Sequence, residues 1–104
     1  MQLTDFRDIL LTADSAATKW KSASTGNYTV WYPFMPIVVM ADGDVAEDGW
    51  RIQVDRFTKN PDDLMIDDIT SALRGNNEIA ITVETITFEP DTGYFHFIWI
   101  CEVA

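Results

Sequence analysis

Apolar side chains recur at helical spacing near the start of the chain. They are Leu3, Phe6, Leu10, Ala13, Ala17 and Trp20. Thr4 is placed to cap a helix that begins here, and Asp5 suits the positive end of the helix dipole. The pattern predicts an amphipathic first helix, whose end we place in the small, polar residues before Gly26 and Asn27.

The next stretch predicts strands. Residues 28–40 are rich in aromatic and β-branched side chains, but Pro33 and Pro36 each remove a backbone donor, so we expect two short strands rather than one. The acidic segment 41–49 predicts a polar turn. After it, alternating apolar residues indicate a half-buried strand: Trp50, Ile52 and Val54. Together these segments predict a hairpin.

A second helix is predicted after this strand. Asn60 can cap it, and Pro61 has the fixed φ that suits the first helical position. Asp62 and Asp63 favour the positive end of the helix. An apolar stripe follows at helical spacing: Met65, Ile66, Ile69, Ala72 and Leu73. Arg74 and Gly75 close the helix.

Two strands complete the chain. Ile79, Ile81 and Val83 alternate in one phase, while Ile86 and Phe88 fall in the other, so we expect a bulge near residues 84–85. The last strand is apolar on both faces, with Phe95, Phe97, Trp99, Cys101 and Val103 on one and Tyr94, Ile98 and Ile100 on the other. Such a strand has to be covered on both sides.

The element order predicts a single α+β domain over residues 1–104, because a chain of this length builds one core. We expect a mainly antiparallel sheet of about four to five strands with two helices on one face, in the order α-β-β-β-α-β-β. Two helices do not readily cover both faces of such a sheet. We therefore expect the far face to meet a partner, and we infer self-association.

The charge narrows the possible partners. Seven lysines and arginines against 17 aspartates and glutamates give a formal net charge of -10, which argues against a basic surface for nucleic acid or anionic membranes. Three roles remain compatible with this acidity: a solvated surface, an imitation of DNA phosphates, or the wall of a channel through which DNA slides. The N-terminus lacks a signal-peptide pattern and no apolar run is long enough to span a bilayer, so we expect a cytoplasmic protein.

No catalytic site is predicted. His96 is the only histidine and lies in an apolar strand, where a hydrogen-bonded structural imidazole is the stronger hypothesis. Cys101, the only cysteine, is at an odd offset from His96 and should project from the opposite strand face, which weakens a Cys-His dyad. We expect no enzyme activity and no cofactor.

The acidic segment could in principle hold calcium or magnesium through its oxygen atoms. Its carboxylates are those of Asp42, Asp44, Glu47 and Asp48. The glycine is misplaced for a helix-loop-helix calcium site and no helices flank the segment, so a solvated acidic turn is the better interpretation. No dedicated metal site is expected.

Three segments carry a resemblance to a known family: VWYPFMPIVVM at 30–40, the acidic turn, and WRIQVDRFTKNPDDLMIDDITSAL at 50–73. The string Val54-Asp55-Arg56-Phe57-Thr58-Lys59-Asn60 joins a strand to a helix. With the N-terminal helix and the aromatic closing strands, the chain resembles the tail-terminator and tail-completion proteins of long-tailed bacteriophages. The resemblance covers most of the chain.

The resemblance implies a structural virion protein that is made in the host cytoplasm and assembles as a ring, commonly a hexamer. Such a ring stops growth of the tail tube, binds the tube and neck (connector) proteins, and lets DNA pass through its lumen without specific binding; no membrane is involved. A neck or head-tail adaptor protein and a small acidic phage inhibitor that imitates DNA are the alternatives. The predicted interface is Asp42, Asp44, Glu47, Asp48, Trp50, Tyr94, Phe95 and Trp99.

Overall fold

The structure is a computed structural model that describes residues 1–23, 25–41 and 43–104, without the side chains of 39–41 and 44–47. Its elements in chain order are α1 (Leu3–Ala13), β1 (Thr18–Lys19), β2 (Tyr28–Ala41), β3 (Asp44–Thr58), α2 (Leu64–Arg74), β4 (Ile79–Glu89) and β5 (Tyr94–Val103). The five strands form one sheet in the order β1-β2-β3-β5-β4, antiparallel except for the short β1-β2 pair. The predicted α+β class and element order are confirmed.

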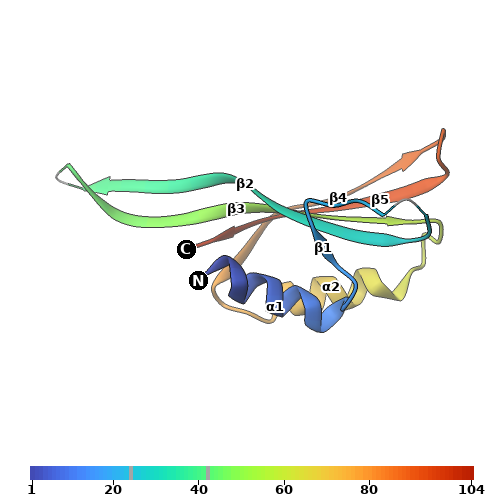
Figure 1. Cartoon of the computed structure of the whole chain (residues 1–104), viewed down its shortest axis with the longest axis horizontal. Coiled ribbons are helices and arrows are strands. Elements are labelled where there is room, and N and C mark those ends of the chain that lie inside the picture. The colour runs from blue at the N-terminus through green and yellow to red at the C-terminus, as the bar shows by residue number, and fades with distance from the viewer. Residues whose placement is uncertain (24, 42) are drawn as a thin grey trace.

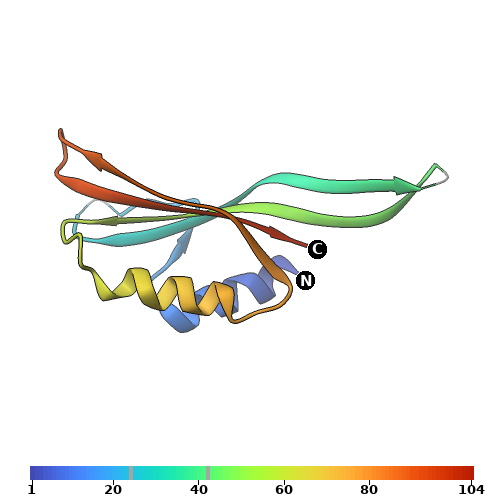
Figure 2. The same ribbon diagram turned by 180° about the vertical axis from the view of Figure 1, so that it is seen from behind.

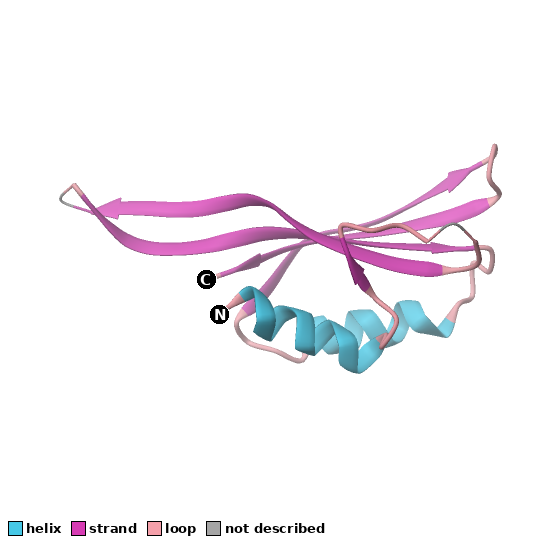
Figure 3. Ribbon diagram, in the orientation of Figure 1, coloured by secondary structure: helices cyan, strands magenta, loops and turns pink. Residues whose placement is uncertain are grey.

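Both helices lie on the same face of the sheet (Figures 1 and 2). Figure 3, coloured by secondary structure, shows the layer of helices beside the layer of strands. The buried core side chains lie between these two layers. The members of the core come from both helices and from β2, β3, β4 and β5, among them Phe6, Leu10, Trp31, Ile52, Val54, Ile69, Leu73, Ile79 and Trp99. Alternation along the strands sends every second side chain into this core and leaves the others on the far face.

A buried arginine ties the middle of the sheet to both helices. Arg56 on β3 is 8% exposed, and its guanidinium donates to the Asp63 carboxylate at 2.9 Å. The same guanidinium lies 3.5 Å from the buried Asp14 carboxylate, which follows α1, and donates to the Thr29 hydroxyl at 3.3 Å. One side chain on a central strand therefore fixes the end of α1, the start of α2 and the adjacent strand β2.

The start of α2 differs from the prediction. Asp63, not Asn60, is the N-cap, and its carboxylate accepts from the Met65 amide at 3.0 Å. Asn60 instead shapes the turn before the helix, because its side-chain oxygen accepts from the Asp62 amide at 2.9 Å. Pro61 lies in this turn, outside the helix. The Asp63 carboxylate also accepts from Arg56, which holds it at the start of the helix.

The first helix is shorter than its apolar spacing suggested. It ends at Ala13, and the capping position at its start is Gln2, whose amide donates to the Asp5 carboxylate at 3.0 Å; Thr4 does not cap it. Ala17 lies beyond the helix end. Trp20 has a left-handed backbone (φ 68°) and stacks on Tyr32, with ring centroids 5.1 Å apart. Ala17 and Trp20 therefore extend the apolar spacing beyond Ala13, although they pack outside the helix.

The segment predicted as two short strands is one long strand, β2. A bulge between Pro33 and Met35 absorbs the first proline without breaking the pairing with β3. Beyond Trp31, β2 has no neighbour on its outer side within the described residues, so proline costs no ladder bond there. The bulge predicted near residues 84–85 occurs instead between Ile81 and Val83.

The predicted acidic turn is mostly strand. β3 begins at Asp44 and pairs with β2 along its whole length, but β5 pairs with β3 only from Trp50 onward. Residues 34–41 and 43–49 therefore form a two-stranded arm that projects beyond the rest of the sheet (Figure 1). The arm raises the radius of gyration to 14.8 Å, against about 13 Å for a compact domain of this length.

We predict that Arg56→Leu destabilises the protein by about 3 kcal/mol, because it leaves the buried Asp14 and the half-buried Asp63 carboxylates without their cation. Urea unfolding at neutral pH measures the loss. Arg7→Leu is the matched control, since Arg7 pairs with Asp8 at an exposed position and its loss should cost about 0.5 kcal/mol. Equal effects of the two substitutions would contradict the role assigned to Arg56.

We further predict that Asp63 gives the protein acid-sensitive stability. Burial alone would raise the pKa of Asp63, but the Met65 amide, Arg56 and Thr58 together lower it below its usual value. A lowered pKa gives stability that is present above about pH 4 and is lost as pH falls through the folded-state pKa.

The test compares the unfolding free energies of the wild-type protein and of Asp63→Asn across acidic pH. The difference between them should be largest at neutral pH and should shrink as the pH falls below about 4. Asp62→Asn, at the exposed neighbouring position, is the control. A difference that stays constant down to the acid limit of the fold would refute the ionised Asp63 link.

Candidate functional site

The face of the sheet opposite the helices is the candidate site. Register assigns to it the side chains of Tyr28, Val30, Tyr32, Gln53, Asp55, Phe57, Tyr94, His96, Ile98 and Ile100. Val30 and Asp55 are buried on this face and the others are half-buried. The loop before β2 touches one end of it, where the Tyr94 hydroxyl donates to the Gly26 carbonyl at 2.6 Å. No helix among the described elements covers the remainder (Figure 2).

A polar cluster lies at the centre of this face. The Asp55 carboxylate is 4% exposed and accepts from the Gln53 amide at 2.9 Å. It also lies 3.0 Å from Nε2 of His96, whose Nδ1 faces the Glu89 carboxylate at 3.4 Å. The His96 imidazole thus has a carboxylate at each ring nitrogen, which agrees with the predicted hydrogen-bonded structural histidine.

Aromatic rings surround the cluster on one side. Phe57 stacks on His96, with centroids 4.1 Å apart, and on Tyr28 at 4.8 Å. Tyr94 meets Phe57 edge-on at 5.9 Å, and the Lys59 ammonium lies 4.2 Å from the Tyr94 ring centroid. These contacts pre-order a flat aromatic surface, and ordered aromatic residues lose little conformational entropy when a partner covers them.

Two side chains of the sheet, Tyr32 and Cys101, have raised pKa values. Burial raises the pKa of Tyr32 to about 12, with further contributions from the charge of Asp55 and a hydrogen bond to it. Burial also raises the pKa of the Cys101 thiol to about 12, aided by Glu84. Phenol and thiol are therefore both protonated at neutral pH and are poor nucleophiles. Cys101 is in the core beneath the helices, on the face opposite His96, as predicted.

Every buried polar side-chain atom in the described residues has a hydrogen-bond partner. The same residues contain no group of three His, Cys, Asp or Glu side chains placed to hold a metal ion. The metal site considered for the acidic segment would involve Asp42, which lies outside the described residues, and Asp44 and Glu47, whose side chains are not described. Among the helices that the structure describes, none is long and apolar enough to cross a membrane.

The predicted interface residues separate into two groups in space. Asp44, Glu47 and Asp48 belong to the arm; the side chains of Asp44 and Glu47 are not described, and Asp48 is exposed. The others lie in the body of the sheet, where Trp50 packs partly against the core, Phe95 packs on Phe88 at 4.9 Å and Tyr94 belongs to the far face.

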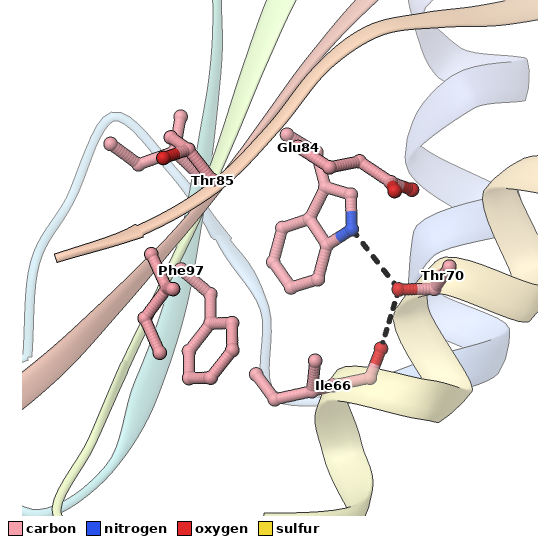
Figure 4. Close-up of a pocket in the computed structure, with 8 residues that line it drawn as sticks. Ile66, Thr70, Glu84, Thr85 and Phe97 are labelled. Carbon is pink, nitrogen blue, oxygen red and sulfur yellow. Dashed lines mark hydrogen bonds between the residues drawn. The ribbon is translucent and has the colours of Figure 1, made fainter. Parts of the chain in front are cut away.

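Trp99 requires a correction. It is 2% exposed, and its indole N–H donates to the Thr70 hydroxyl at 3.1 Å, so it is a core residue and not a surface contact. It lines a groove of about 230 Å³ together with Ile66 of α2, Ile86 of β4 and Phe97 of β5; Ile66 and Phe97 are labelled in Figure 4. α2 does not close this groove against β4, because Ile86 and Phe88 of that strand stay exposed.

Sequence reasoning missed Asp55 as the partner of His96. The two residues are 41 positions apart, and only the register between β3 and β5 brings them together. No local signal marked Asp55 as buried, because it falls in the polar phase of the alternating strand, with Arg51 and Gln53. Tyr32 and Gln53 join the same carboxylate and carried no separate signal in the sequence.

We predict that Tyr32 titrates with a pKa well above the ordinary tyrosine value. A raised pKa means that its stabilising effect is complete below about pH 10 and is lost as pH rises towards the folded-state value. Absorbance titration of phenolate should show a component near pH 12 that disappears in Tyr32→Phe. Tyr94→Phe is the control and should retain it; a wild-type curve with all phenols at their ordinary value would refute the buried Tyr32-Asp55 contact.

Comparison with known proteins adds no assignment. No protein-family model matches the chain, and no curated protein matches it either. The function is therefore inferred from three surfaces of the chain itself: the far face of the sheet, the projecting arm, and the groove between α2 and β4.

Proposed function

We propose that this protein is a structural virion protein that assembles into a ring, caps the tail tube of a long-tailed bacteriophage and joins the tube to the neck. The observation that carries the proposal is a sheet covered by helices on one face only, from which a two-stranded arm projects. A fold of this kind leaves ordered surface for copies of itself, and its activity is binding without turnover.

The far face supports self-assembly through its composition. Half-buried aromatic and aliphatic side chains surround one hydrogen-bonded polar cluster, which is centred on Asp55 and His96. Interfaces between subunits typically combine an aromatic, apolar centre with a few satisfied polar groups. A catalytic site would need an activated group, and the raised pKa values of Tyr32 and Cys101 point away from one.

The arm supports contact beyond the subunit's own core. A two-stranded ribbon is marginal in water unless something packs against it. The arm, residues 34–41 and 43–49, carries exposed apolar side chains on β2, including Phe34 and Val38. Packing against a neighbouring copy would stabilise it.

The charge supports a role beside DNA rather than on it. A net charge of -10 repels the phosphate backbone, which suits a lumen through which DNA slides. The outward-facing residues of both helices add to this acidity, with exposed Asp5, Asp8, Asp67 and Asp68. Copies with this charge must meet through uncharged surface, and residues 28–40 contain no charged side chain.

We predict that the purified protein forms a discrete closed assembly whose mass is a whole multiple of 11.8 kDa, with the hexamer expected from the resemblance. Native mass spectrometry gives the copy number, and negative-stain electron microscopy should show rings. Mixed with tail tubes polymerised from the tube protein of the same genome, the rings should sit at one tube end and halt elongation.

Binding to isolated head connectors but not to tubes would favour the neck or adaptor alternative. A protein that stays monomeric at all concentrations and leaves tube growth unchanged would contradict the proposal. Salt-sensitive binding to a DNA-binding enzyme, in competition with DNA, would indicate the DNA-mimic alternative instead.

A further inference from the structure

We propose that neighbouring copies join head to tail through two apolar patches on opposite edges of the sheet. The arm patch comprises Phe34, Met35 and Val38 on β2, and the edge patch comprises Val83, Ile86 and Phe88 on β4. Each patch extends around its edge strand onto both faces of the sheet, because register places Met35 and Val83 on the far face but Val38, Ile86 and Phe88 on the helix-side face. The arm patch of one copy packs on the edge patch of the next. This inference rests on the proposed ring and specifies how its subunits meet.

The distribution of exposed apolar side chains is the first observation. The described residues contain eight exposed large hydrophobic side chains, and six of them form these two patches, each between 39% and 55% exposed. The sheet order β1-β2-β3-β5-β4 places β2 beyond Trp31 at one edge and β4 at the other. Two patches on opposite edges of one subunit suit contacts with two different neighbours.

Shape is the second observation. The arm patch is on a projection, whereas the edge patch borders the groove of about 230 Å³ between α2 and β4. The groove is lined mainly by apolar side chains, among them Ile66 and Phe97. A projecting ribbon and an apolar hollow are complementary, while two projections or two hollows are not.

Charge selects the arm of a second copy over its β4 strand as the occupant. β4 carries Glu84 and Glu89, so pairing β4 with itself would bring carboxylates of like sign together. The facing part of β2 belongs to the uncharged run 28–40. The carboxylates of the arm belong to β3, where exposed Asp48 pairs with Val38, so the outer strand β2 meets β4 with less repulsion than β3 would.

The backbone indicates that side chains carry the contact. The Trp31 carbonyl accepts from the Trp20 amide, so Trp31 directs its backbone groups to the outer edge of β2. Residues two apart point the same way, so Pro33 also faces that edge, where it has no N–H to offer. A continuous intersubunit strand ladder is therefore blocked near Pro33, and packing of Phe34, Met35 and Val38 remains.

Joining two different patches has a consequence for symmetry. Such a contact is heterologous: each copy uses its arm towards one neighbour and its β4 edge towards the other. Repetition closes into a ring if the rotation per copy allows it and otherwise gives a filament. A contact between two identical patches would stop at a dimer.

Three double variants test the inference by native mass spectrometry. The arm variant is Met35→Asp with Val38→Asp, and the edge variant is Ile86→Asp with Phe88→Asp. The control is Trp20→Asp with Leu64→Asp, which adds the same charge at the two remaining exposed hydrophobic positions. Circular dichroism and urea unfolding first establish that all three are folded.

At concentrations where the wild type assembles, each patch variant alone should be monomeric, because its concentration for half-assembly is raised at least about tenfold. The control should assemble as the wild type does. An equimolar mixture of the arm and edge variants should give a one-to-one dimer and nothing larger. In that dimer the intact arm of one variant meets the intact edge of the other.

Four outcomes overturn the inference. Wild-type assembly of either patch variant shows that its patch is not needed, and absence of the mixed dimer shows that the contact is not head to tail. Equal loss of assembly in the control shows that added charge alone is responsible. These three outcomes leave the ring proposal intact. The fourth outcome, a monomeric wild type, removes both the ring and the inference.

Discussion

The whole structure depends on one constraint, which is that two helices of 11 residues each cover a five-stranded sheet on one face only. The covered face provides the core, and Arg56 fastens both helices to it. The other face is ordered by a bonded Asp55-His96 pair and stacked aromatic rings, but most of its side chains stay half-buried and open to a partner. The most exposed apolar side chains of the strands lie at the two edges of the sheet.

The string Val54 to Asn60 shows how one short segment serves both layers. Val54 enters the core, Asp55 organises the far face, and Arg56 returns to the helices. Phe57 then stacks on His96, and Asn60 shapes the turn into α2. Alternation along a strand allows this division of labour, because consecutive residues point to opposite faces. The string is thus specified by architecture, whatever the protein binds.

Periodicity was enough to predict the fold class, the element order and the helix-covered face, because burial dictates where apolar residues recur. It did not predict that β2 runs unbroken through Pro33, since that depends on which strand edge is free. The Asp55-His96 pair and the core position of Trp99 also depend on strand register and helix placement. These are properties of the assembled sheet, and local sequence does not encode them.

The central claim is that identical copies cover the surface which the helices leave bare. Hydroxyl-radical footprinting at low and high protein concentration measures this coverage directly, side chain by side chain. The account predicts that Met35 and Phe88 are oxidised more slowly at high concentration, while Leu64, which is 76% exposed on α2, is oxidised at the same rate throughout. Oxidation of all three at rates independent of concentration would contradict it.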